Sequence, residues 1–119
     1  PVYLNLLQIR LPVAGVMSIV HRITGMLMFL ATPFLIYLLD LSLSSGHGFD
    51  RAGQLIQSGL GKLALFGMLW GLLHHLFAGI RYLLLDIHIG VEKPWYRHTA
   101  WAVLLAAPAL ALGLTGVLL

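Results

Sequence analysis

Two adjacent histidines, His74 and His75, lie within an otherwise uncharged apolar run from Leu63 to Ile80. Ionisable side chains are costly inside a membrane segment, where they mark functional sites by default. Adjacent residues of a helix project about 100° apart, so the two imidazoles cannot serve one centre in the same way. One of the two is therefore the better candidate for binding a ligand.

The surroundings of the two histidines differ along the helix. Residues at four-residue spacing form a stripe of small side chains around one imidazole: Gly67, Gly71, His75 and Gly79. Such a stripe either lets another membrane helix approach closely or leaves a groove for a flat cofactor that the imidazole would bind. His74 lies on a more crowded face, between Trp70 and Ala78, and we expect it to have a structural, hydrogen-bonding role. The spacing leaves both interpretations of the His75 stripe open.

If His75 binds a metal, haem iron suits it best, because a neutral imidazole in an apolar slot is a usual haem ligand. Zinc would need three or four ligands, and none cluster here. The chain contains no cysteine, which excludes disulfides and thiolate-held clusters within it. The other histidines are near the start of the first apolar helix or in or beside connections: His21, His47, His88 and His98. A second axial ligand is therefore expected from a partner chain.

Two arginines are expected at one level beside this slot. Arg81 follows His75 by about 9 Å along a helix, and Arg22 follows His21 at the start of the first apolar helix. Together they predict a cationic band suited to haem propionates, although snorkelling of each arginine toward lipid phosphates is an alternative. Ser18, one turn before Arg22, could help to hold the polar head of a quinone, and a lipid headgroup would fit the same pair.

The elements that position these groups are membrane helices. Of the 119 residues, 60% are hydrophobic and 9% are charged, whereas a soluble domain carries about a quarter charged residues. Three apolar runs reach the roughly 20 residues that cross a bilayer. The sequence predicts an all-α membrane protein of one domain, residues 1–119. Its expected elements are an interfacial arm at about 1–15 and helices at about 16–44, 62–88 and 99–119.

The charged residues predict the orientation of these helices. Five of the lysines and arginines fall on the side of the amino terminus and the second connection, and two fall on the other side. The positive-inside rule places the richer side in the cytoplasm or the mitochondrial matrix. Trp95 and Tyr96, in the second connection, are expected to anchor it at the interface. The net charge of +3 is scattered, with no basic patch typical of nucleic-acid binding.

Two motifs carry a resemblance to a known family. The stretch "SIVHRITG", after an amino-terminal "PVYLNLLQIRLPV", and the stretch "HHLFAGIRYLLLD" fit the patterns S-x-x-H-R-x-[ST]-G and H-x-x-x-G-I-R. The chain resembles the cytochrome b556 subunits of succinate dehydrogenase, which are membrane anchors of complex II. The resemblance covers nearly the whole chain and is least informative over the third helix. One departure is Tyr82, where many members have histidine directly after G-I-R.

The resemblance implies half of a six-helix heterodimeric anchor bundle that binds haem b and ubiquinone. The expected partners are a second anchor subunit that supplies the other haem ligand, an iron–sulfur subunit and a flavoprotein subunit. By the motifs, His75 is the axial ligand of the haem iron. The residues implied around the haem are His21, Arg22, Gly71, Gly79 and Arg81. Those implied at the quinone are Ser18, Ile19 and Arg22.

The implied activity is succinate:quinone oxidoreduction, with succinate oxidised in another subunit because this chain has neither a flavin motif nor cysteines. The expected location is a bacterial inner membrane, or alternatively the mitochondrial inner membrane, with the carboxyl terminus on the periplasmic side in the bacterial case. Two alternatives stay open: a fumarate reductase or other b-type cytochrome anchor, and a haem-free packing subunit of a membrane complex.

Overall fold

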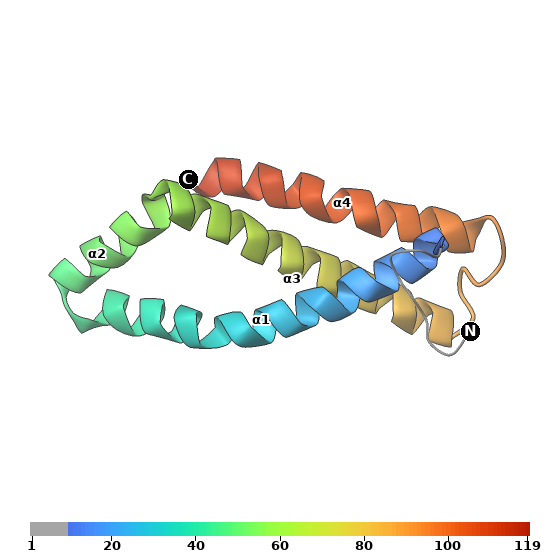
Figure 1. The fold of residues 1–119 in the computed structure, drawn as a ribbon, viewed down its shortest axis with the longest axis horizontal. Helices are drawn as coiled ribbons and strands as arrows, with labels where there is room; N and C mark the ends of the chain where they lie inside the picture. Colours follow the sequence, from blue (N-terminus) through green and yellow to red (C-terminus); the bar gives the residue numbers. More distant parts are fainter. Residues whose placement is uncertain (1–9) are drawn as a thin grey trace.

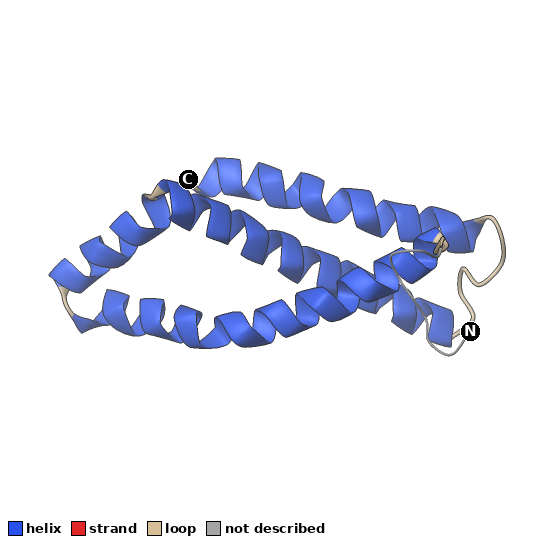
Figure 2. Ribbon diagram, viewed as in Figure 1, coloured by secondary structure: helices blue, strands red, loops and turns tan. Residues whose placement is uncertain are grey.

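The structure, a computed structural model, describes residues 10–119. Within this range the chain is helical and contains no strand (Figure 2). The helices are α1 (Val13–Ser44), α2 (Gly46–Gln57), α3 (Gly59–Asp86) and α4 (Trp95–Leu118) (Figure 1). Most of the expected interfacial arm, residues 1–9, lies outside the described residues, and α1 already begins within the remainder of it.

Three of the four helices are long and apolar enough to cross a membrane: α1, α3 and α4. This confirms the all-α fold with three spanning helices. Pro33 lies inside α1 and Pro108 inside α4. Each proline removes one backbone hydrogen bond from its helix, a loss that membrane helices tolerate where local adjustments satisfy the freed carbonyl.

The additional helix, α2, occupies the segment between the first two predicted membrane helices, about 16–44 and 62–88, where no helix was expected. α2 contains three glycines, and a serine lies at each of its two boundaries. The Ser45 hydroxyl accepts a hydrogen bond from Gly48 N–H at the start of α2, and the Ser58 hydroxyl accepts one from Gly61 N–H at the start of α3. Such caps satisfy backbone donors that a helix leaves free in its first turn. The connection is therefore a short helix with a serine cap on each side.

The spanning helices do not pack equally. The α3 and α4 helices run antiparallel and lie side by side, whereas α1 contacts both of them in its first half and then diverges toward α2 (Figure 1). The divergence leaves a cavity of about 350 Å³ between α1, α2 and α3, and the side chains that line it are all apolar. The contacts of α1 with α4 are thus near its amino-terminal end, and its contacts with α2 are near its carboxyl-terminal end.

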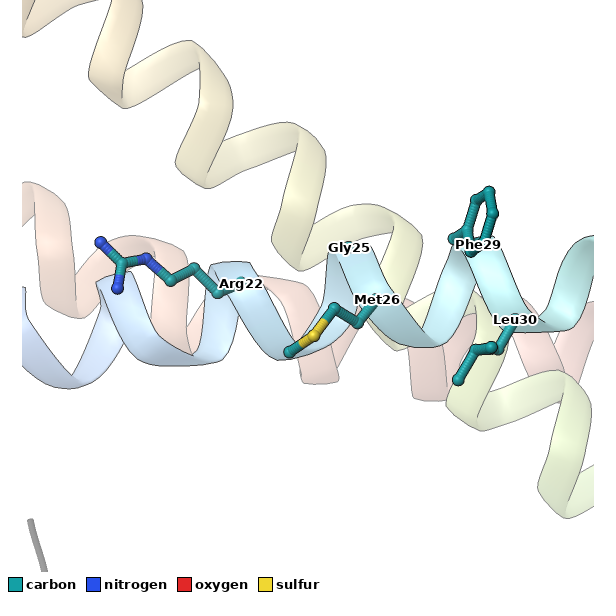
Figure 3. A pocket seen from close by; sticks show the side chains of 5 residues that line it. All are labelled: Arg22, Gly25, Met26, Phe29 and Leu30. Atoms are coloured by element: carbon teal, nitrogen blue, oxygen red, sulfur yellow. The ribbon is translucent and has the colours of Figure 1, made fainter.

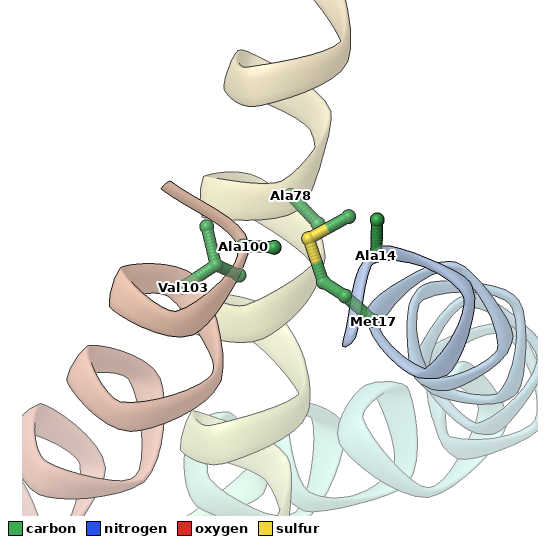
Figure 4. Close-up of a cluster of buried hydrophobic side chains, with 5 residues drawn as sticks. All are labelled: Ala14, Met17, Ala78, Ala100 and Val103. Carbon is green, nitrogen blue, oxygen red and sulfur yellow. The ribbon is translucent and has the colours of Figure 1, made fainter. Parts of the chain in front are cut away.

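The core lies where α1, α3 and α4 meet (Figure 4). It is built mainly from small side chains, together with one methionine: Ala14, Met17, Ala78, Ala100 and Val103. Small residues let membrane helices approach closely, because van der Waals packing drives their association in lipid. Ala107 and Ala111 are also fully buried and extend the row of buried small side chains along α4.

The carboxyl-terminal end of α3 closes with a left-handed residue. His88 has φ 63°. Its N–H donates to the carbonyl of Leu85, and the N–H of Ile89 donates to the carbonyl of Leu84. These two bonds form a Schellman motif, in which the left-handed position is usually glycine. The connection then leads to α4, which begins at Trp95, just after Pro94.

Candidate cofactor site

The contact between α1 and α3 is close because glycines occupy it. A Cβ at Gly25 of α1 would lie 2.8 Å from Cε1 of His75, which is closer than side-chain atoms approach. On α3, a Cβ at Gly71 would lie 3.9 Å from Cβ of Thr24, and one at Gly79 would lie 3.9 Å from Nε2 of His21. The structure therefore places Gly71, His75 and Gly79 of the stripe against α1, whereas a Cβ at Gly67 would meet nothing within 4 Å among the described residues.

The His75 imidazole is oriented by α1. Its Nδ1 lies 3.0 Å from the backbone carbonyl oxygen of His21. A carbonyl oxygen can only accept, so Nδ1 carries the proton and Nε2 keeps its lone pair. The His21 ring stacks on the His75 ring with centroids 4.0 Å apart and planes 8° apart, and the Tyr82 ring meets the edge of His21 at 5.3 Å. The result is one fixed imidazole with a nitrogen ready to bind a metal.

An apolar groove adjoins this imidazole. It has a volume of about 460 Å³ and lies between α1 and α3. Its lining consists of Gly25, Met28, Phe29, Thr32, Leu35, Met68, Leu69, Leu72 and His75. A second depression of about 650 Å³ continues along α1, shares Gly25 and Phe29 with the first, and has Arg22 at its end (Figure 3). The imidazole and the guanidinium thus belong to one continuous surface.

Ser18, Ile19 and Arg22 lie in the first half of α1. Ser18 and Ile19 are half-buried, and Arg22 is exposed. Ser18 and Arg22 are both within the helix and four residues apart, so they are neighbours on its surface. Among the predicted quinone residues, Arg22 is the one that lines the depression.

His74 has a different environment. Its side chain is fully buried, and its Nε2 donates to the backbone carbonyl of Met17 at 3.4 Å. Its Nδ1 has no hydrogen-bond partner among residues 10–119. The Trp70 ring lies 6.0 Å away, and the site is in the interior rather than on the groove. This geometry fits the predicted structural role.

Arg81 points toward α4 rather than toward the groove. Its Nε donates to the Thr99 hydroxyl at 3.0 Å, and its Nη2 donates to the Tyr96 carbonyl at 2.8 Å. Its guanidinium carbon lies 4.8 Å from the centre of the Tyr96 ring, within the range of a cation–π contact. The structure thus does not form the expected cationic band of Arg22 and Arg81, because the Arg81 guanidinium binds α4 instead.

Comparison with known proteins identifies the family of the chain. Residues 1–114 match the model of the succinate dehydrogenase/fumarate reductase transmembrane subunit family. The chain belongs to this family. Its relatives include the succinate dehydrogenase cytochrome b556 subunit of Coxiella burnetii, which is 38% identical over 98% of this chain and 94% of the relative. The same subunit of Paracoccus denitrificans is 32% identical over 86% of this chain and 78% of the relative.

Membership of the succinate dehydrogenase/fumarate reductase transmembrane subunit family agrees with the three apolar helices, and the chain is an integral membrane protein. The relatives are named as cytochrome b556 subunits, a name that denotes a haem b protein. The residues around His75 fit such a group. The Nδ1 proton is held by a backbone carbonyl, the Nε2 lone pair has no partner among residues 10–119, and the adjoining groove is lined mainly by apolar side chains.

The sequence analysis missed Thr24, a functional candidate at the centre of this contact. The side chain is fully buried, its hydroxyl donates to the carbonyl of His21 at 2.9 Å, and Oγ1 lies 3.5 Å from Nδ1 of His75. The only sequence signal was its place as the [ST] position of the S-x-x-H-R-x-[ST]-G motif. That position gives no indication of which side chain on α3 it would meet.

Proposed function

We propose that this chain is the haem b- and quinone-binding anchor subunit of a succinate:quinone oxidoreductase. The observation that carries the proposal is the fixed His75 imidazole, which lines an apolar groove and whose Nε2 has no hydrogen-bond partner among residues 10–119. In the proposal His75 binds the haem iron, and the haem supplies a one-electron centre when it is bound. Among residues 10–119 no group of three or more His, Cys, Asp or Glu gathers to hold a metal, and the second axial ligand comes from a second anchor subunit.

The outer face of α1 supports pairing with such a second subunit. Large apolar side chains on this face are strongly exposed, among them Phe29, which is 78% exposed, and Phe34, which is 72% exposed. Phe29 also lines both depressions next to His75 and Arg22. A partner helix packed on this face would cover the groove and complete the six-helix anchor. The iron–sulfur and flavoprotein subunits of the proposed complex would lie on the side where α1 begins.

The proposed quinone site uses Ser18, Ile19 and Arg22. The Ser18 hydroxyl donates a hydrogen bond to a quinone carbonyl, and Ile19 offers apolar contact to the ring. The Arg22 guanidinium stabilises the negative charge that develops on the quinone oxygen during reduction, an electrostatic role that preorganised donors perform well in a dry site. In this proposal His21 and Arg22 also lie near the haem propionates, and Arg81 acts indirectly, by holding α4 against α3.

The test is a reduced-minus-oxidised visible spectrum of the purified membrane complex with wild-type chain, His75→Ala or His74→Leu. We expect a sharp b-type α-band in the wild type, loss or displacement of the band in His75→Ala, and an unchanged band in His74→Leu. The two variants change neighbouring residues of one helix, so general damage to α3 would affect both. An unchanged band in His75→Ala would overturn the haem assignment.

The quinone assignment has its own test. Ser18→Ala and Arg22→Ala should each lower the rate of quinone reduction by about 10-fold or more, as loss of an electrostatic stabiliser does, while the haem band is retained. Arg97→Ala, which removes an exposed arginine of α4, is the matched control and should leave the rate unchanged. Normal quinone kinetics in both α1 variants would contradict the assignment.

A fumarate reductase anchor is the second candidate, because the matching family contains both kinds of subunit. The fold and the site serve electron flow in either direction. The potential of the quinone that the complex prefers distinguishes the two. A high-potential ubiquinone favours succinate oxidation, and a low-potential quinone favours fumarate reduction.

A further inference from the structure

Thr24 and His75 both direct a polar hydrogen toward the same atom, the backbone carbonyl oxygen of His21. The Thr24 hydroxyl donates to it over 2.9 Å, and Nδ1 of His75 donates to it over 3.0 Å. The carbonyl belongs to the interior of α1, where it also has its ordinary backbone role as acceptor from the residue four positions later. A carbonyl oxygen has two lone pairs, so three donors share one acceptor.

This crowding links the hydroxyl to the imidazole. A donor that occupies part of the carbonyl lone pairs weakens the acceptor toward the remaining donors. The hydrogen bond from the ring N–H of a metal-binding histidine sets how strongly the other nitrogen donates to the metal, because a stronger bond makes the imidazole more basic. The Thr24 hydroxyl therefore acts on His75 mainly through the His21 carbonyl, because its own distance to Nδ1, 3.5 Å, is at the limit of a hydrogen bond.

We propose that Thr24 is a positioning residue that limits the strength of the His75 Nδ1–H bond and so raises the reduction potential of the group bound at Nε2. The inference rests on the proposed haem role of His75. Removing the hydroxyl leaves the carbonyl more available to Nδ1, which makes His75 a stronger electron donor. Stronger donation favours the oxidised metal and lowers the potential.

A purely structural role of Thr24 makes a different prediction. Its side chain is fully buried, and its methyl group lies 4.0 Å from where a Cβ at Gly71 would be. If only this packing matters, valine should replace threonine with little effect, because valine has nearly the same shape. The hydroxyl alone distinguishes the two proposals.

The test is the haem midpoint potential in the purified complex, measured by optical redox titration for wild type, Thr24→Val, Thr24→Ser and Thr24→Ala. Wild type and valine differ by one hydroxyl at nearly constant shape, and serine and alanine differ by one hydroxyl at a smaller volume. We expect the midpoint potential to be more negative in Thr24→Val than in wild type. We also expect it to be more negative in Thr24→Ala than in Thr24→Ser. The serine variant should stay near the wild-type midpoint. If the valine variant does not assemble, the serine and alanine pair gives the same comparison.

Equal midpoints within both pairs, or a shift toward positive potential on loss of the hydroxyl, would overturn the proposal. A serine midpoint displaced as far as that of alanine, with the valine midpoint equal to that of wild type, would assign the effect to packing and overturn it as well. The outcome is separable from that of the proposed function. If His75→Ala abolishes the haem band but both pairs have equal midpoints, the haem assignment stands and the Thr24 role fails. If His75→Ala leaves the band unchanged, the haem assignment itself fails.

Discussion

The two sides of α3 offer contrasting environments to two histidines that are adjacent in the sequence. On the side of the core, His74 is fully buried among α1, α3 and α4. On the other side, His75 is half-buried, hydrogen-bonded to the His21 carbonyl and stacked on the His21 ring of α1, and it lines an apolar groove. The difference shows that in a membrane helix the rotation of about 100° between neighbours is enough to separate a packing position from a binding position.

Side-chain size reinforces the contrast. The packed side uses alanines that are almost completely buried, including Ala78, Ala100 and Ala107. The open side combines a glycine at the closest approach with large apolar side chains that have no neighbour among residues 10–119 on their outer surface, such as Phe29. The small residues let the helices of this chain pack against one another, and the large exposed residues leave a surface on which a second chain can pack.

The strongest way to break the contrast is to fill the open side at its narrowest point. Gly25→Ala should displace the His75 imidazole, because the new Cβ would lie 2.8 Å from Cε1 and 3.3 Å from Nδ1. Disturbing the support of a metal-binding histidine costs about 10–100-fold in affinity, so we expect the haem affinity to fall by about 10-fold or more, with a lower haem content per complex in the pyridine haemochrome assay. Gly113→Ala, where a Cβ would meet nothing within 4 Å, is the control and should keep its haem. Full haem occupancy in Gly25→Ala would contradict the close contact.

A smaller but still large effect is expected on the packed side. Arg81→Met removes a buried guanidinium that holds the Thr99 hydroxyl and the Tyr96 carbonyl. Hydrogen bonds to charged groups contribute about 1.5–3 kcal/mol, so the free energy of unfolding should fall by about 2–3 kcal/mol. Thermal denaturation of the purified complex would measure the loss. Arg81→Lys should recover only part of it, because lysine lacks the planar fork of donors. An unchanged transition in Arg81→Met would mean that the α3–α4 contact does not depend on these bonds.

The end of α3 offers a change in the opposite direction. His88→Gly should raise the free energy of unfolding by about 1 kcal/mol, because a residue with a Cβ in the left-handed region costs roughly 1–2 kcal/mol and His88 has φ 63°. Position 90 also has a left-handed backbone, with φ 78°, and is already a glycine, so the opposite substitution there serves as the control. Gly90→Ala should destabilise by a similar amount. A destabilised His88→Gly would indicate that the imidazole has a role beyond closing the helix.

The smallest effect is expected at His74. Its hydrogen bond to the Met17 carbonyl is long, at 3.4 Å, and its Nδ1 has no partner among residues 10–119. A buried polar atom without a partner costs free energy, so the loss of one weak bond in His74→Leu is offset by the loss of that penalty. We expect the free energy of unfolding, measured by chemical denaturation, to change by less than about 1 kcal/mol. A large destabilisation would show that Nδ1 binds a group that the isolated chain does not supply.

The sequence was sufficient to predict the three spanning helices because length and apolar composition decide membrane insertion without tertiary contacts. It did not predict α2, because three glycines within twelve residues disfavour a helix and the Ser45 cap adds stability only once the first turn has formed. The spacing along α3 did indicate that Arg81 shares a face with His74 rather than with His75. Arg81 lies seven residues after His74, two helical turns along the same face, whereas it lies six residues after His75.

Other parts of the site depend on how α1 and α3 align, which one sequence does not determine. The His75 stripe was recognisable because its spacing is local to one helix. The stacking of His21 on His75 and the position of Thr24 at their shared carbonyl depend on residues more than fifty positions apart. Nothing in the local pattern fixes the relative height and rotation of two helices.

The divergence of α1 from α3 has a consequence for how the chain behaves when it is taken out of its membrane. The cavity of about 350 Å³ beneath α2 is lined by apolar side chains, and in a bilayer the solvent at that depth is hydrocarbon. Acyl chains are therefore part of the solvation of this subunit. Detergent extraction exchanges that solvent for molecules of another length and shape, so the spacing of α1, α2 and α3 becomes a property of the protein together with its amphiphile.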